Sequence, residues 1–215
     1  MGAEVVRPFD AVVFDFSGVV VSSAFGVLTA VLGDQLDEDA ALELLLGPYD
    51  RDTDHPWHRV ERGELELMAW ARHVEAEAAD RGLQVDWDAV RRMFGEMTVH
   101  DVVVDRVVAL RADGYRTALL TNNVKEGSDT WRALVPVDDL FDVVVDSSSV
   151  GMRKPDPRIF ALTLERLGGI EPARAVFLDD HPGNVDGARR AGLAAILVAD
   201  PADAVAELDA LLAPA

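Results

Sequence analysis

The chain has 215 residues, of which 49% are hydrophobic, which is enough apolar material for one domain or for a domain with a sizeable insertion. Its formal net charge of −19 at pH 7 argues against a nucleic-acid backbone or an anionic membrane as partner, but leaves small phosphorylated molecules open. Because the chain has no cysteine, disulfides, thiolate metal sites and cysteine nucleophiles are excluded.

The first predicted element is a short buried strand at residues 11–15, which is rich in valine and bounded by turn residues. From about residue 24 to residue 96 the apolar pattern is instead helical. It is clearest over 40–46 and 65–79, where Ala, Leu and Glu recur three and four residues apart. The first half of the chain is therefore one strand followed by a long helical block.

From about residue 101 onward, helices and strands alternate. The pattern predicts helices at 102–112, 157–167, 184–191 and 202–212, and strands at 116–120, 141–145, 175–178 and 194–198.

Continuous apolar strands separated by amphipathic helices are typical of a parallel sheet that is covered on both faces. The first strand belongs with this second half of the chain. The sequence therefore predicts an α/β fold with a doubly wound parallel sheet, formed by residues 1–20 and 98–215. Residues 21–97 would form a helical insertion.

Polar residues follow several of the predicted strands directly. Asp15 ends the first strand, Thr121 follows the strand at 116–120, and Asp179 follows the strand at 175–178. In open parallel sheets, ligands bind outside the carboxyl ends of the strands. We therefore expect these side chains to share one crevice.

These residue types suit a nucleophilic site assisted by magnesium. The carboxylate of Asp15 can attack a phosphoryl group or a carbon centre and form a covalent intermediate. Lys154 can supply a compact positive charge, and Thr121 can hold oxygens that are not transferred. Asp179 and Asp180, together with Asp15, offer the hard oxygen ligands that Mg²⁺ prefers. Each residue alone has an ordinary structural explanation, but their joint order along the chain favours a site.

Four segments resemble the four motifs of the haloacid dehalogenase-like hydrolase superfamily. They are Asp15-Phe16-Ser17-Gly18-Val19, Leu119-Leu120-Thr121-Asn122-Asn123, Lys154-Pro155-Asp156-Pro157, and Val176-Phe177-Leu178-Asp179-Asp180 with the residues up to Ala188. The helical insertion lies where that family has its C1 cap. The whole chain looks most similar to small phosphatases related to the N-terminal domain of soluble epoxide hydrolase, a subgroup that the stretch at 56–64 also resembles.

The resemblance implies a Rossmann-like core and a role for each matched residue. Asp15 would be the nucleophile, Thr121 with Asn122 would bind phosphate, and Lys154 would steady the charge. Asp179 and Asp180 would serve the metal.

Ser17 departs from the pattern of the family's phosphatases, which commonly have an aspartate at this position to protonate the leaving group and to activate water. Its backbone carbonyl, which the family uses as a metal ligand, is unaffected by the replacement. A general acid or base contributes roughly 10²–10⁴-fold in rate. The loss would matter little for a good leaving group such as a sugar 1-phosphate or an acyl phosphate. Otherwise His55 or His58 of the cap would substitute for it, or the protein would be slow or inactive.

The implied function is a Mg²⁺-dependent phosphatase that acts on a small phosphorylated metabolite. Two alternatives remain: a 2-haloacid dehalogenase that needs no metal, and a catalytically weak protein that binds phosphorylated ligands. Trp57, His58 and Gly18 are the expected substrate contacts.

We expect neither nucleic acid nor membrane as a partner, and either a monomer or a homodimer. No apolar stretch approaches the ~20 residues that span a bilayer, and the N-terminus lacks the pattern of a signal peptide. These features predict a cytoplasmic protein.

Overall fold

A computed structural model of the chain describes residues 7–23, 31–88 and 97–213. Its centre is a parallel five-stranded sheet with the strand order β3-β2-β1-β4-β5. The strands are β1 (Ala11–Phe14), β2 (Arg116–Thr121), β3 (Val143–Asp146), β4 (Ala175–Asp179) and β5 (Ala194–Leu197). The first strand thus lies in the middle of a sheet whose other strands come from the second half of the chain.

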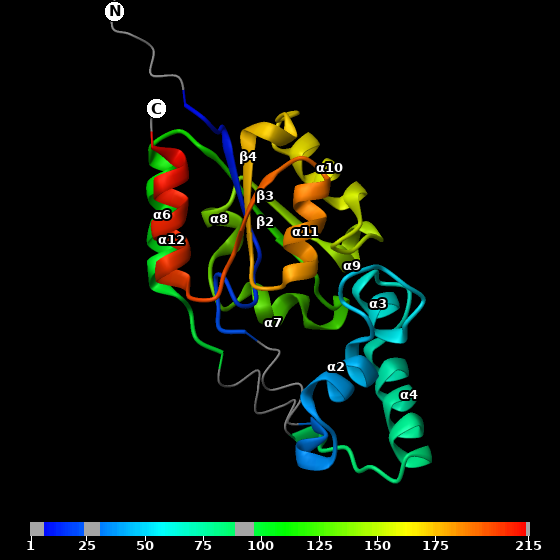
Figure 1. The fold of residues 1–215 in the computed structure, drawn as a ribbon. Helices are drawn as coiled ribbons and strands as arrows, with labels where there is room; N and C mark the ends of the chain where they lie inside the picture. Colours follow the sequence, from blue (N-terminus) through cyan, green and yellow to red (C-terminus); the bar gives the residue numbers. More distant parts are fainter. Residues whose placement is uncertain (1–6, 24–30, 89–96, 214–215) are drawn as a thin grey trace, which may run out of the picture.

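Helices cover both faces of this sheet (Figure 1). On one face lie α6 (Asp101–Ala112), α7 (Ser128–Arg132), α8 (Val137–Leu140) and α12 (Pro201–Leu212), and on the other lie α10 (Pro157–Arg166) and α11 (Pro182–Arg190). A short helix, α9 (Ser147–Val150), follows β3, and the 3-10 turns are η3 (Lys125–Gly127) and η4 (Pro172–Arg174).

Strand β1 shows why the sheet needs both layers. Val12 and Phe14 pack into the core on the side of α6 and α12, whereas Ala11 and Val13 pack into the core on the side of α10 and α11. Successive side chains of a strand point to opposite faces, so a strand that is apolar at every position must be buried on both.

A separate helical lobe is formed by η2 (Gly33–Gln35), α2 (Glu38–Leu46), α3 (Pro56–Glu61) and α4 (Leu67–Asp80) (Figure 1). It has its own apolar cluster, in which Trp70 is 3% exposed and packs with Leu45 and Val60. The indole N–H of Trp70 also donates to the carbonyl of Leu45 at 2.9 Å, so the buried ring leaves no unsatisfied donor.

The two connections between this lobe and the sheet layers lie side by side. Val21 and Val99 form an antiparallel bridge, and the backbone N–H of Ser22 donates to the carbonyl of Thr98 at 2.8 Å. The chain therefore leaves the sheet domain and returns to it at one place, which is the geometry of an insertion.

The predicted fold class is confirmed, and the long helices and the strands lie within a few residues of their expected positions. Strand β3 begins at Val143 rather than at residue 141. Just before it, the backbone N–H of Asp142 donates to the carbonyl of Thr117 at 3.0 Å and the Asp142 carboxylate accepts the backbone N–H of Thr117 at 2.9 Å. The short helices α7, α8 and α9 were not predicted. The expected boundaries of the insertion stay a prediction, and residues 24–30 and 89–96 of the expected helical block lie outside the described residues.

Among the described residues, no helix is both long enough and apolar enough to cross a bilayer.

Candidate functional site

Asp15 lies at the carboxyl end of the central strand, where a tight turn follows at once. Its backbone N–H donates to the carbonyl of Leu178 on β4 at 2.9 Å, which continues the pairing of the two strands. One carboxylate oxygen accepts the N–H of Phe16 at 2.7 Å, and the carbonyl of Phe16 accepts the N–H groups of Val20 and Val21. The side chain of Asp15 is therefore fixed by its own turn and is only 7% exposed.

Lys154 joins this carboxylate to the neighbouring strand. Its ammonium lies 2.8 Å from Asp15 Oδ1 and 2.6 Å from Asp179 Oδ2, and the residue is completely buried. Asn122 holds the backbone of Lys154 on both sides, because its Oδ1 accepts the Lys154 N–H at 2.8 Å and its Nδ2 donates to the Lys154 carbonyl at 3.1 Å. The loop after β2 thus determines where the ammonium lies.

Asp179, the last residue of β4, uses both of its carboxylate oxygens within the protein. Besides Lys154, the backbone N–H of His181 donates to it at 2.8 Å, and Nδ2 of Asn184 donates at 3.0 and 3.1 Å. Asp179 therefore anchors the ammonium and the start of α11.

Asp180 differs from Asp179, because one of its carboxylate oxygens has no hydrogen-bond partner among the described residues. Its Oδ2 accepts from the Ser23 hydroxyl at 2.9 Å, whereas its Oδ1 is buried and has no hydrogen-bond partner among the described residues. Gly18 lies against this carboxylate with φ = 79°, and a Cβ atom built there would be 1.9 Å from Oδ2. The glycine is needed both for the turn and for the approach of Asp180.

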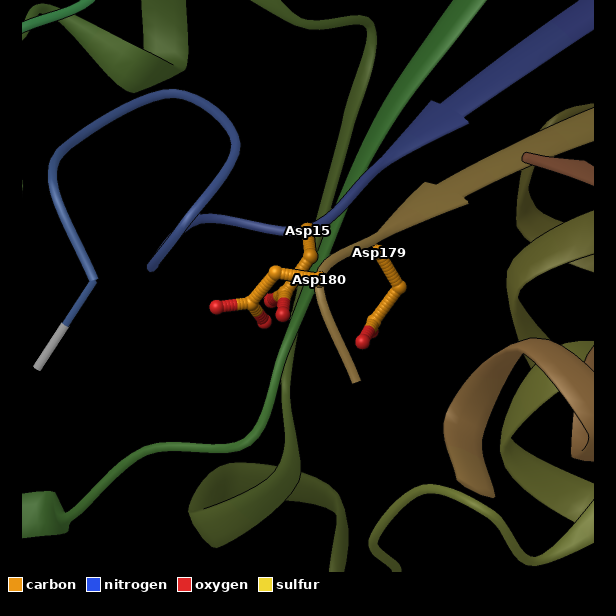
Figure 2. Close-up of side chains that lie close together, drawn as sticks. All are labelled: Asp15, Asp179 and Asp180. Atoms are coloured by element: carbon orange, nitrogen blue, oxygen red, sulfur yellow. The ribbon is translucent and has the colours of Figure 1, made fainter. Parts of the chain in front are cut away.

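The three carboxylates of Asp15, Asp179 and Asp180 gather at the ends of β1 and β4, as Figure 2 shows. Each offers one oxygen, and these three atoms lie within 4.8 Å of one another. Three hard oxygen donors and an unpartnered buried Oδ1 fit a divalent cation such as Mg²⁺.

The charges of the site explain why a cation would be favourable there. Burial raises the pKa of Asp15 well above its usual range, an effect that Lys154 opposes and that Asp179 and Asp180 reinforce. Burial, reinforced by Asp179, also raises the pKa of Asp180 to about 6. For Lys154, burial favours the neutral amine, but Asp15 and Asp179 outweigh it and raise its pKa. The buried carboxylates thus exceed the positive charge that Lys154 supplies.

Thr121 and Asn122 lie at the same edge of the sheet, as expected. Thr121 is the last residue of β2 and is 1% exposed, and its hydroxyl makes a long contact of 3.4 Å with the carbonyl of Asn122. Ser17 is half-buried in the turn after Asp15 and forms a bridge with Val21. The roles of these three residues toward a substrate stay predictions.

The lobe residues Trp57 and His58 have different surroundings. Trp57 packs on Trp70 with the ring centroids 4.8 Å apart. His58 is completely buried, and its Nδ1 accepts the backbone N–H of Thr53 at 3.0 Å, so Nε2 carries the proton. Burial and Arg153 lower the pKa of His58 to about 3. A buried neutral imidazole is poorly suited to protonating a leaving group, and the expected substrate contacts of both residues stay predictions.

Two residues of this region were missed by reasoning from the sequence. Asn184 holds Asp179, and its place five residues later, on the first turn of a helix that follows the strand, is a spacing that could have indicated it. Arg153 is buried beside Lys154 and pairs with Glu61, at 92 residues' separation. No local pattern indicates that pairing.

The protein thus has an α/β fold whose parallel sheet brings a carboxylate, a lysine and an acidic pair together at its carboxyl edge. The family model of the haloacid dehalogenase-like hydrolases matches residues 9–192, and the chain belongs to this family.

Relatives with known names agree with this assignment. The chain is 34% identical over 212 residues to Acyl-CoA dehydrogenase family member 10 of Mus musculus, a match that covers 96% of this chain and 19% of that protein. It is 28% identical over 214 residues to Bifunctional epoxide hydrolase 2 of Rattus norvegicus, covering 91% and 37%. The chain thus spans only a minor part of these two relatives. The phosphoglycolate phosphatase of Psychrobacter arcticus is 30% identical over 185 residues, covering 80% and 76%.

Solved structures share the fold at low sequence identity. A haloacid dehalogenase-family enzyme of Bacteroides thetaiotaomicron, in complex with magnesium and inorganic phosphate, has a TM-score of 0.61 at 18% identity and covers 89% of this chain and 96% of its own. A structure described as a dehalogenase has a TM-score of 0.66 at 19% identity and covers 98% and 100%.

The buried His58 makes stability depend on pH. The unfolded chain binds a proton on this imidazole below about pH 6.5, whereas the folded protein does so only below about pH 3. This contribution is therefore complete above pH 6.5 and is lost as the pH falls, by about 2 kcal/mol at pH 5. Because the raised pKa of Asp180 works in the opposite direction in both proteins, the measure is their difference: between pH 7.5 and 5.0, urea unfolding should show about 2 kcal/mol more loss of stability in the wild type than in His58→Gln.

The imidazole signals of His58 in NMR spectra should also not titrate between pH 8 and 4.5. A midpoint near pH 6.5 would contradict the buried neutral imidazole.

Proposed function

We propose that the chain is a Mg²⁺-dependent phosphatase that hydrolyses a small phosphorylated metabolite through an aspartyl-phosphate on Asp15. The observation that carries this proposal is the position of the Lys154 ammonium, 2.8 Å from Asp15 and 2.6 Å from Asp179, beside Asp180 with its unpartnered oxygen. Such a site combines a fixed nucleophile with a cation for an anionic substrate and with spare ligands for a metal.

The relatives support a phosphate substrate. One of them is named a phosphoglycolate phosphatase, and a solved structure of the same fold holds magnesium and inorganic phosphate. We extend this chemistry to the present chain because Asp15 and the acidic pair lie at the ends of adjacent parallel strands and the Lys154 ammonium lies between Asp15 and Asp179.

Asp15, the backbone carbonyl of Ser17 and Asp180 would hold the magnesium ion. Asp179 is the less suitable ligand, because Lys154, His181 and Asn184 already use both of its oxygens. When bound, the ion neutralises charge on the phosphoryl oxygens during transfer.

Each residue of the site has its own role in the proposed reaction. An oxygen of Asp15 forms a bond to phosphorus while the bond from phosphorus to the leaving oxygen breaks. Lys154 neutralises the phosphoryl group and favours the ionised form of Asp15, and Thr121 and Asn122 orient the non-bridging oxygens. Water then hydrolyses the aspartyl-phosphate, which releases inorganic phosphate and restores the carboxylate of Asp15.

Ser17 determines which substrates suit this site. A serine hydroxyl does not protonate a departing alkoxide as a carboxylic acid does, so the leaving oxygen must take its proton from water. This favours substrates with a good leaving group, such as a sugar 1-phosphate or an acyl phosphate. We infer a small metabolite as the partner, not a nucleic acid or a membrane, and a cytoplasmic location.

A second candidate is a 2-haloacid dehalogenase, in which Asp15 attacks carbon and no metal is needed. Ser17 favours it, since this chemistry needs no acid at that position, and one neighbour of the same fold is described as a dehalogenase. The acidic pair of Asp179 and Asp180 favours the phosphatase. Halide release that persists in EDTA would establish the dehalogenase.

The central test is phosphate release from a broad panel of phosphorylated metabolites, with and without magnesium. The wild type should release phosphate only with magnesium, and Asp15→Asn should lower the rate by at least about 10³-fold because the nucleophile is lost. Asp186→Asn, the same change at an exposed carboxylate on α11, is the control and should retain activity. No release from any substrate by the folded wild type with magnesium would refute the proposal.

The contact between Gly18 and Asp180 predicts an effect on the metal. Gly18→Ala should raise the magnesium concentration for half-maximal activity by about tenfold or more, because the added methyl group must displace the Asp180 carboxylate. Gly33→Ala is the matched control, since Gly33 also has a positive φ of 56° but has nothing within 4 Å of an added Cβ. Equal magnesium dependence of the two variants would exclude Asp180 as a ligand.

The missing acid predicts how the rate responds to the leaving group. Across a series of aryl phosphates, the rate of the wild type should fall steeply as the leaving-group pKa rises. Ser17→Asp should make this dependence less steep and accelerate the substrates with the poorest leaving groups by up to roughly 10²–10⁴-fold. Ser17→Asn introduces a neutral side chain of the same shape as aspartate and should cause neither change. Equal slopes for all three proteins would mean that another group donates the proton.

A further inference from the structure

A buried ion pair joins the helical lobe to the sheet domain. Arg153 Nε donates to Glu61 Oε2 at 2.5 Å, and the two residues are 0% and 1% exposed. Glu61 is the last residue of α3 in the lobe, whereas Arg153 directly precedes Lys154 in the loop that supplies the ammonium of the site. The lobe therefore contacts the loop that contains Lys154 through the ion pair of Glu61 with Arg153.

Tyr49 extends this contact to the other side of the site. Its hydroxyl donates to Glu61 Oε1 at 2.7 Å, and the guanidinium of Arg153 lies 4.8 Å from the centre of its ring. The same ring packs against His181 with the centroids 4.6 Å apart, and the backbone N–H of His181 donates to Asp179. Glu61 and Tyr49 thus contact Arg153, which precedes Lys154, and His181, whose backbone holds Asp179.

The backbones of the two parts also meet closely here. A Cβ atom at Gly63 would lie 2.3 Å from the carbonyl oxygen of Ser148, and one at Gly183 would lie 2.9 Å from the Cα atom of Asp50. The segment from Tyr49 to Gly63 is therefore packed on the loops before Lys154 and after Asp179.

Arg153 depends on Glu61 for its charge balance in this arrangement. Among the described residues its Nη2 has no hydrogen-bond partner, and its Nη1 reaches only the Arg51 carbonyl at 3.3 Å and Asp52 at 3.9 Å. Asp52 is held more closely by Arg62. A buried charge without a partner is strongly unfavourable, whereas water would solvate it if the lobe moved away. Without Glu61, the packed arrangement would therefore lose stability relative to an open one.

We propose that Glu61 is a positioning residue of the active site: its ion pair with Arg153 holds the lobe closed and keeps the Lys154 loop in place. This inference rests on the proposed phosphatase function for its kinetic consequence, but not for the movement itself. A substrate that binds the packed arrangement more tightly would shift the equilibrium toward it, so substrate binding and the position of the lobe would be coupled.

The kinetic test is Glu61→Gln, which keeps the shape of the side chain and removes its charge. If the closed arrangement is then a minor fraction of the free enzyme, KM should rise about tenfold, while kcat at saturating substrate should change less than about threefold. Glu64→Gln is the matched control, because Glu64 lies in the same segment but pairs with Arg62 at the surface. KM and kcat that match the control, with only a lower Tm, would overturn the proposal.

The double variant Glu61→Gln/Arg153→Met should have a smaller KM defect than Glu61→Gln alone, because no charge is left buried and unpaired. An equal or larger defect in the double variant would show that the pair does not act through charge.

A distance measurement tests closure without reference to activity. The chain has no cysteine, so spin labels can be attached at Met68→Cys on α4 and Glu165→Cys on α10, both of which are exposed. The wild-type background should give one narrow distance distribution, and Glu61→Gln a broader and longer one that the double variant narrows again. An unchanged distribution in Glu61→Gln would overturn the proposal. A broadened one in a protein that releases no phosphate would refute the phosphatase and support the closure.

Discussion

The ion pairs of Lys154 are the interaction on which the rest of this structure depends. One buried ammonium lies within 3 Å of two buried carboxylates, Asp15 and Asp179, which come from adjacent strands. Removing one partner of a buried pair typically costs roughly 3–5 kcal/mol. Losing any one of the three groups would therefore leave a buried group without its ion-pair partner, and under the proposed function the Lys154 ammonium also attracts the anionic substrate. The ion pairs of Lys154 thus bear both on the stability of the fold and on the proposed reaction.

The parallel sheet makes this convergence possible. Its strands all end at the same edge, so residues far apart in the sequence meet there without any long-range signal between them. The loops then set the fine geometry. Asn122 holds the backbone of Lys154 from β2, and Asn184 holds Asp179 from the first turn of α11. Neither asparagine has to touch the substrate to determine where the charges lie.

The helical lobe adds the second constraint. Its pair of Glu61 with Arg153, and the packing of Tyr49 on His181, reach the two sides of the site that Lys154 joins. The lobe imidazole of His58 is neutral and accepts a hydrogen bond at Nδ1, so this residue is not suited to donate a proton to the leaving group. With Ser17 in the turn after Asp15, protonation of the leaving group falls to water or to the substrate itself, under the proposed mechanism.

The sequence by itself determined the α/β fold and the family, and it predicted which side chains meet at the carboxyl edge of the sheet, because strand ends and their polar successors are local patterns. Apolar runs followed by Asp15, Thr121 and Asp179 suffice for this, and Lys154 is identified by its motif. Only the tertiary structure decided how the carboxylates differ: Asp179 accepts hydrogen bonds from Lys154 and Asn184, whereas Oδ1 of Asp180 has no hydrogen-bond partner among the described residues. It also decided the pairing of Arg153 with Glu61. The contact of Lys154 with Asp179 and the pairing of Arg153 with Glu61 join segments that are separate in the chain, and neither periodicity nor spacing carries information about such contacts.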